Sequence, residues 1–134
     1  MRILVADDSV EERDLLAGFL ARRGHSVEWV EDGQGAVNAA AREAFDLVLM
    51  DSIMPNMVGN QAVRLIRKQD KQGGHYTPVI FVSSLDDPSE IVASLGFGAD
   101  DYLIKPIDWD VLEAKLRVFA RISSQHRALE KYRL

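Results

Sequence analysis

The chain has 134 residues with 47% hydrophobic and 28% charged side chains, which suits one soluble domain with a single core and is too short for two. Its net charge is −5, it has no cysteine, and no apolar run approaches the roughly 20 residues that span a bilayer; a disulfide framework, a thiolate metal site and a membrane span are therefore excluded. Two aspartates arrive before a signal-peptide core could form, which indicates a cytoplasmic location.

The first half of the chain alternates between strand and helix patterns. Residues 2–6 form a short apolar run, and a capping box that begins at Ser9 predicts a helix after it. The apolar residues expected on one face of that helix are Leu15, Leu16, Phe19 and Leu20. A second strand at 27–30 precedes an alanine-rich helix that follows Asp32, and a third strand is predicted at 45–50.

The second half repeats the alternation. A third helix is predicted to end before the polar loop at 71–74, and a fourth strand covers residues 79–82. Asp87 is followed by proline, which is typical of an N-cap and first helical position, so a fourth helix begins there. A fifth strand at 102–104 precedes a long helix that starts near Trp109 and runs towards the C-terminus.

Five strands alternating with five helices predict an α/β fold in which a doubly wound parallel sheet has helices on both faces. Periodicity alone does not order the strands. In such folds, ligands bind at the carboxyl ends of the strands, close to the switch point of the topology. The polar residues that follow four of the predicted strands, and are expected at this edge, are Asp7, Asp8, Asp51, Ser83 and Lys105.

These residue types together indicate phosphoryl chemistry. Three aspartates at one edge repel one another unless a cation lies between them, and Mg²⁺ is a hard cation that prefers oxygen ligands. Lys105 and the Ser83 hydroxyl can hold an anion beside such an ion, so the predicted guest is a phosphoryl group. Asp51 is then a suitable nucleophile, because a carboxylate can attack phosphorus and form an acyl phosphate.

Each of these residues also has a plain structural explanation when it is considered alone. Asp7 and Asp8 could favour a helix N-terminus through its dipole, and Asp51 could cap a turn. Ser83 could be an ordinary turn residue, and Lys105 a solvated surface lysine. Their joint occurrence after the first, third, fourth and fifth predicted strands favours the functional interpretation.

The sequence resembles a response-regulator receiver domain of two-component signalling over residues 2 to about 120. The segments that carry the resemblance are Val5–Asp8, Leu49–Pro55, Gly59, Pro78–Ser83 and Gly98–Pro106. The resemblance implies a flavodoxin-like sheet with strand order 2-1-3-4-5. It also implies that Asp51 accepts a phosphoryl group from a histidine kinase, so that the protein is a signalling switch and not an enzyme acting on other substrates.

The resemblance further assigns the metal site. Asp8 and Asp51 would be direct Mg²⁺ ligands, with the backbone carbonyl of Ile53 as a third. Asp7 would act on the ion through a water molecule. Mg²⁺ is thus the expected cofactor.

The resemblance also assigns the switch. Lys105 would contact the phosphoryl group, and Ser83 would be the hydroxyl that moves inward to bond it. Tyr102 would be the aromatic side chain that rotates with Ser83. The bond between Lys105 and Pro106 is expected to be cis by similarity, although most X–Pro bonds are trans.

The last helix extends beyond the usual end of such a domain. We therefore divide the chain into a receiver domain at 1–121 and a helical extension at 122–134. Apolar and polar residues recur there at spacings of four and three, as in the seam of a coiled coil: Val118, Ile122, Gln125, Leu129 and Tyr132. This pattern predicts a parallel homodimer and a linker to an output domain of the diguanylate cyclase or serine phosphatase type; the alternative is a solvated helical overhang.

The residues packed on the other face of this helix are expected to be Leu112, Leu116 and Phe119. Residues 114–134 carry 6 basic and 1 acidic side chain, a composition that can indicate nucleic-acid binding. Basic residues also suit the C-terminal end of a helix dipole, and we favour that explanation, so no direct nucleic-acid binding is expected.

Other functional classes compete with the switch. A stand-alone adaptor without an output domain is the strongest rival. A haloacid-dehalogenase-like phosphatase is a weak one, because it needs an acid/base aspartate where this chain has Ile53. A pseudo-receiver that never accepts phosphate is disfavoured, since every residue that the chemistry needs is present.

Overall fold

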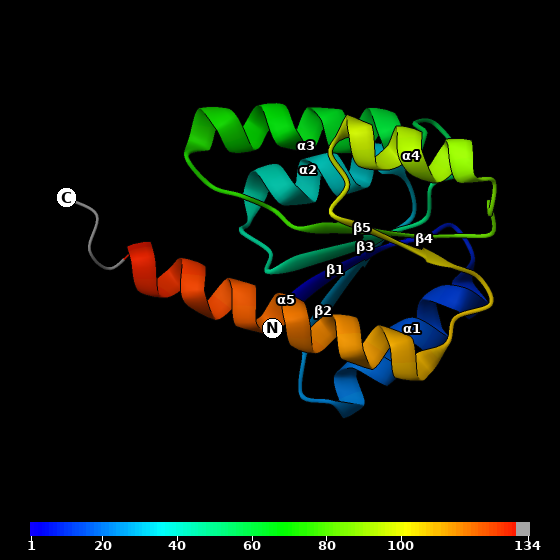
Figure 1. The fold of residues 1–134 in the computed structure, drawn as a ribbon, viewed down its shortest axis with the longest axis horizontal. Coiled ribbons are helices and arrows are strands. Elements are labelled where there is room, and N and C mark those ends of the chain that lie inside the picture. Colours follow the sequence, from blue (N-terminus) through cyan, green and yellow to red (C-terminus); the bar gives the residue numbers. More distant parts are fainter. Residues whose placement is uncertain (131–134) are drawn as a thin grey trace.

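The computed structural model describes residues 1–130 and contains a five-stranded parallel sheet with helices on both faces (Figure 1). The strands are β1 (Arg2–Ala6), β2 (Ser26–Val30), β3 (Leu47–Met50), β4 (Val79–Ser83) and β5 (Asp101–Ile104). The helices are α1 (Val10–Arg22), α2 (Gly33–Arg42), α3 (Gly59–Gly73), α4 (Pro88–Phe97) and α5 (Trp109–Glu130). The strand order β2-β1-β3-β4-β5 confirms the predicted fold class and the order implied by the resemblance.

The core lies on both sides of the sheet. Figure 1 shows α2, α3 and α4 over one face and α1 and α5 over the other. Successive residues of β1 point to opposite faces, so Leu4 belongs to the first apolar cluster and Ile3 to the second. Apart from Arg2 at the start of β1 and Ser83 at the end of β4, the inner strands are apolar because both of their faces are covered. No helix in the described part of the chain combines the length and apolar character that crossing a bilayer requires.

The inward face of α1 differs from the prediction at one residue. Leu16, Phe19 and Leu20 are buried as expected, but Leu15 is 64% exposed. The stripe that faces the sheet begins instead with Arg13, which is buried and stacks its guanidinium carbon 3.6 Å from the centre of the Trp29 ring. The long side chain of arginine lets a charged residue occupy this position.

The end of α3 also differs from the prediction. The helix continues through Gly73, whereas the polar loop was expected to begin at Lys71. Lysine and glutamine are good helix formers, so polarity alone does not end a helix. The chain leaves α3 at Gly74, which has a φ of 67° and forms a left-handed cap that glycine adopts at low cost.

Candidate functional site

Backbone hydrogen bonds continue beyond the strand ends and bring the predicted site residues to one edge of the sheet. The amide of Asp51 donates to the carbonyl of Ala6 at 2.9 Å, which places Asp51 beside Asp7. The amide of Lys105 donates to the carbonyl of Ser83 at 2.8 Å. Parallel pairing therefore gathers residues that lie far apart in the chain at the carboxyl ends of the strands, as predicted from their positions after the apolar runs.

Three carboxylates meet at this edge. One oxygen from each of Asp7, Asp8 and Asp51 lies within 4.8 Å of the others, and Asp7 is buried while Asp8 is exposed. Burial raises the pKa of the Asp7 carboxyl above its usual value, although a hydrogen bond from the Ser9 amide and the charge of Lys105 act in the opposite direction. An all-oxygen donor set that opens to solvent on one side fits a Mg²⁺ ion that keeps several waters.

Lys105 supplies the positive charge of the site. Its Nζ lies 2.9 Å from Oδ2 of Asp51 and 3.3 Å from Oδ2 of Asp7, and it also contacts Glu12. Burial by itself lowers the pKa of the Lys105 ammonium, but the hydrogen bonds to Glu12 and Asp51 and the surrounding negative charge raise it well above its usual value. Lys105 therefore stays charged and partly neutralises the carboxylates around it. The bond between Lys105 and Pro106 is cis, which confirms that expectation.

Glu12 is a member of the site that sequence reasoning did not identify. The capping box that begins at Ser9 has Glu12 as its last residue, and in such a box the Glu12 side chain returns to the amide of Ser9. Only half of that box forms, because Ser9 Oγ accepts from the Glu12 amide at 3.3 Å while the Ser9 amide donates to Asp7. The Glu12 carboxylate turns to Lys105 instead, and this hydrogen bond lowers its pKa. The available signal was its place in the first turn of the helix that directly follows Asp7 and Asp8.

The two residues expected to form the switch, Ser83 and Tyr102, belong to a chain of hydrogen bonds beside this cluster. Ser83 is fully buried, its Oγ lies 2.5 Å from Oγ of Ser52, and it accepts from the Leu85 amide at 3.2 Å. The Tyr102 hydroxyl donates to the carbonyl of Leu85 at 2.9 Å. The Tyr102 ring packs edge-on against Phe81, with the ring centres 6.2 Å apart. Ser83 and Tyr102 are thus linked through one residue, Leu85.

Two backbone features fix the loop between Asp51 and α3. The Ile53 amide donates to Oδ1 of Asp51 at 2.9 Å, so the backbone at Ile53 already contacts the Asp51 side chain. The loop ends at Gly59, where an added Cβ would lie 2.8 Å from the Phe81 ring and 2.9 Å from the Cα of Ser52. A larger residue at 59 would therefore displace the segment that follows Asp51.

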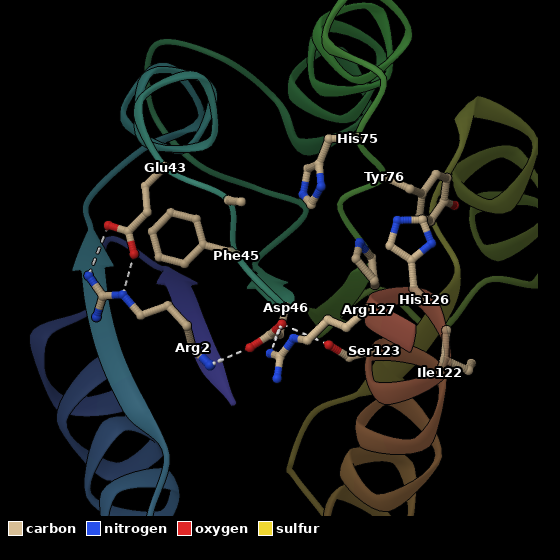
Figure 2. A pocket seen from close by; sticks show the side chains of 12 residues that line it. Arg2, Glu43, Phe45, Asp46, His75, Tyr76, Ile122, Ser123, His126 and Arg127 are labelled. Atoms are coloured by element: carbon tan, nitrogen blue, oxygen red, sulfur yellow. Dashed lines mark hydrogen bonds and ion pairs between the residues drawn. The ribbon is translucent and has the colours of Figure 1, made fainter. Parts of the chain in front are cut away.

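A hollow of about 530 Å³ lies beside the starts of β1, β3 and β4 (Figure 2). Asp7, Asp8 and Asp51 follow the other ends of β1 and β3. Its wall includes the end of α5, where Ser123 Oγ donates to Asp46 at 2.7 Å and the Arg127 guanidinium contacts the same carboxylate. The backbone amide of Arg2 also donates to Asp46, at 2.7 Å. Figure 2 shows these groups converging on Asp46, so the extension of α5 is docked on the start of the sheet.

Comparison with known proteins identifies the family. A family model described as "Response regulator receiver domain" matches residues 3–117. The chain is 40% identical over 121 residues to the response regulator protein PmrA of Pseudomonas aeruginosa, covering 90% of this chain and 53% of that protein. It is 35% identical over 121 residues to the transcriptional activator protein IrlR of Burkholderia pseudomallei, covering 90% and 51%.

A solved structure shows the same relationship. The receiver domain of the sensor histidine kinase PA1611 from Pseudomonas aeruginosa, crystallised with a magnesium ion coordinated in its active site cleft, superposes with a TM-score of 0.78 at 29% identity, covering 92% of this chain and 97% of that one. The chain spans about half the length of the curated relatives it matches. With its five-stranded sheet and its aspartate cluster, this chain belongs to the response-regulator receiver domain family.

Proposed function

We propose that this receiver domain is a phosphorylation-dependent switch in which Asp51 accepts a phosphoryl group from a histidine kinase or a small phosphodonor. The observation that carries the proposal is that Asp51 lies beside Asp7 and Asp8 and contacts the Lys105 ammonium. A carboxylate oxygen of Asp51 attacks phosphorus, an acyl phosphate bond forms, and the bond from phosphorus to the donor's nitrogen or oxygen breaks with its electron pair staying on the donor.

The metal ligands in this proposal are Asp8, Asp51 and the carbonyl of Ile53, with Asp7 acting through water. The acidic cluster and the magnesium-bound receiver of PA1611 support it. When bound, Mg²⁺ neutralises negative charge on the transferring oxygens. Lys105 stabilises the same charge from the protein side.

The metal assignment predicts a selective effect at Asp8. Asp8→Asn should weaken Mg²⁺ binding by roughly 10- to 100-fold, because it removes one charged ligand from the site. Titration calorimetry with MgCl₂ measures the affinity directly. The matched control is Asp14→Asn, which removes an equal charge from an exposed position of α1. Equal Mg²⁺ affinities of the Asp8 variant and the unchanged protein would contradict this assignment.

In the switching step, Ser83 moves to bond the phosphoryl group and Tyr102 rotates with it. The shift in population is then read on the face formed by α4, β5 and α5. Exposed apolar residues on these three elements that could contact a partner are Val92, Leu95, Phe97, Ile104, Val111 and Val118.

The switch acts in the cytoplasm and passes its change to an output domain or to a separate effector. A diguanylate cyclase or serine phosphatase type of output was expected from the helical extension. IrlR is named a transcriptional activator, so an output that regulates transcription is a further candidate. The stand-alone adaptor stays the alternative. The coding sequence after codon 134 distinguishes a receiver with an output domain from a stand-alone adaptor, because an output domain encoded there would exclude the adaptor.

The extension of α5 supports homodimerisation of the receiver. Leu112, Leu116 and Phe119 are buried against the sheet, as predicted, while the seam residues are exposed. The described seam residues are Val118, Ile122, Gln125 and Leu129, and the predicted Tyr132 lies outside the described residues. The proposed dimer pairs this seam with the same seam of a second copy.

Charges placed in the seam should separate such a dimer. Val118→Glu with Leu129→Glu puts four carboxylates into the interface of two copies, so sedimentation velocity should shift from dimer to monomer. Ser124→Glu is the matched control, because it adds a charge on an exposed, off-seam position of the same helix. Identical sedimentation of the unchanged protein, the double variant and the control would refute dimerisation through this seam.

A further inference from the structure

Ser52, the residue that follows the acceptor, holds the buried switch hydroxyl. Its Oγ lies 2.5 Å from Oγ of Ser83, which is within hydrogen-bond distance for two hydroxyls. Ser83 is fully buried and also accepts from the amide of Leu85 at 3.2 Å. A buried hydroxyl with two such neighbours is satisfied where it stands, and any movement of Ser83 must break the contact with Ser52.

The backbone around Ser52 keeps its hydroxyl in this place. The amide of Gly59 donates to the carbonyl of Ser52 at 2.9 Å, and α3 begins at Gly59. A Cβ at position 59 would lie 2.9 Å from the Cα of Ser52, so the start of α3 packs directly on this residue. The backbone of Ser52 is therefore supported by the start of α3, which keeps Ser52 beside Ser83.

We propose that Ser52 is a positioning residue that stabilises the unphosphorylated arrangement by occupying the hydroxyl of Ser83. This inference rests on the proposed role of Asp51 as the phosphoacceptor. Whichever of the two hydroxyls donates, Ser83 can move inward to bond a phosphoryl oxygen only by giving up its contact with Ser52. Ser52 and the phosphoryl group on Asp51 thus compete for Ser83, and the competition sets how strongly phosphate shifts the switch.

The same contact reaches the aromatic part of the switch. Ser83 Oγ also accepts from the amide of Leu85, and the carbonyl of Leu85 accepts from Tyr102 at 2.9 Å. Ser52 is thereby connected to Tyr102 through two shared residues. Removal of the Ser52 hydroxyl should favour the arrangement in which Ser83 is free to bond an anion on Asp51, without changing the metal ligands.

The test is a titration of the whole chain with beryllofluoride, a phosphoryl mimic, in saturating Mg²⁺. Ser52→Ala should bind beryllofluoride roughly 2- to 10-fold more tightly, the factor expected when one neutral hydrogen bond no longer opposes binding. Ser52→Thr retains the hydroxyl and should bind as the unchanged protein does. Ser124→Ala removes a hydroxyl from an exposed position of α5 and serves as the control.

A double-mutant cycle separates this role from a purely structural one. In a Ser83→Ala background, Ser52→Ala should have no further effect on beryllofluoride affinity, because its partner is already absent. An equal gain in both backgrounds would overturn the competition. Equal or weaker binding by Ser52→Ala in the otherwise unchanged protein would overturn it as well. Absence of Asp51-dependent binding in both proteins would overturn the phosphoacceptor function and this inference together.

Discussion

Lys105→Met is expected to slow phosphorylation of Asp51 by acetyl phosphate by roughly 100- to 1,000-fold, the loss typical when one preorganised charge-stabilising donor is removed. The ammonium lies 2.9 Å from the acceptor carboxylate and is only 14% exposed, so water cannot easily take its place. Methionine retains most of the length and the apolar stem of lysine. A time course of phosphorylation followed by mass spectrometry gives the rate.

The same substitution should affect Mg²⁺ in the opposite direction. Without the Lys105 charge, Asp7 and Asp51 attract a cation more strongly, so Mg²⁺ should bind more tightly while the chemistry slows. Lys115→Met is the matched control, because Lys115 forms its 2.6 Å ion pair with Asp101, at the opposite end of β5 from Lys105. An unchanged phosphorylation rate, or weaker Mg²⁺ binding, in Lys105→Met would contradict the role assigned to this residue.

Asp46→Ala should lower the free energy of unfolding by roughly 1.5–3 kcal/mol, the range for hydrogen bonds to a charged group. The carboxylate of Asp46 accepts from the backbone amide of Arg2, from Ser123 and from Arg127, and it is only 14% exposed. Its loss leaves the Arg2 amide without this acceptor and releases the end of α5 from the sheet. Urea denaturation measures the change, and Asp14→Ala on the exposed side of α1 is the control.

The contribution of Asp46 should depend on pH. Burial alone would raise the pKa of Asp46, but the hydrogen bonds from Arg2, Ser123 and Arg127 lower it below its usual value overall. A carboxyl with a lowered folded-state pKa stabilises the fold above its unfolded value of about 3.9, and this stabilisation is lost as pH falls through the folded value. The difference in stability between the unchanged protein and Asp46→Ala should therefore stay constant from pH 7 down to about pH 4 and shrink as the pH falls further. A difference that does not shrink below about pH 4 would refute the explanation.

Much of the site could be predicted because it depends on chain order. Asp51, Ser83 and Lys105 each follow an apolar run, and parallel pairing places the residues after such runs at one edge. The order of the strands and the cis bond before Pro106 came from the resemblance, since no periodicity encodes them.

The residues that were missed are those whose contacts cross between elements. Glu12 fits a local capping pattern, yet its carboxylate accepts a hydrogen bond from Lys105, 93 positions further along the chain. Ser52 appeared only as the neighbour of Asp51, although it contacts Ser83. Asp46 was read as part of a strand, whereas its carboxylate binds the end of α5. Side-chain partners of this kind depend on the packed fold and leave no periodic signal in the sequence.

The central claim is that Asp51 is the phosphoacceptor. Intact-mass spectrometry after incubation with acetyl phosphate and Mg²⁺ tests it most directly, with Asp51→Asn as the matched variant. We predict that the unchanged protein gains the mass of one phosphoryl group, that removal of Mg²⁺ by a chelator prevents the gain, and that Asp51→Asn gains none. Equal modification of the two proteins, or no modification of the unchanged protein, would contradict the claim.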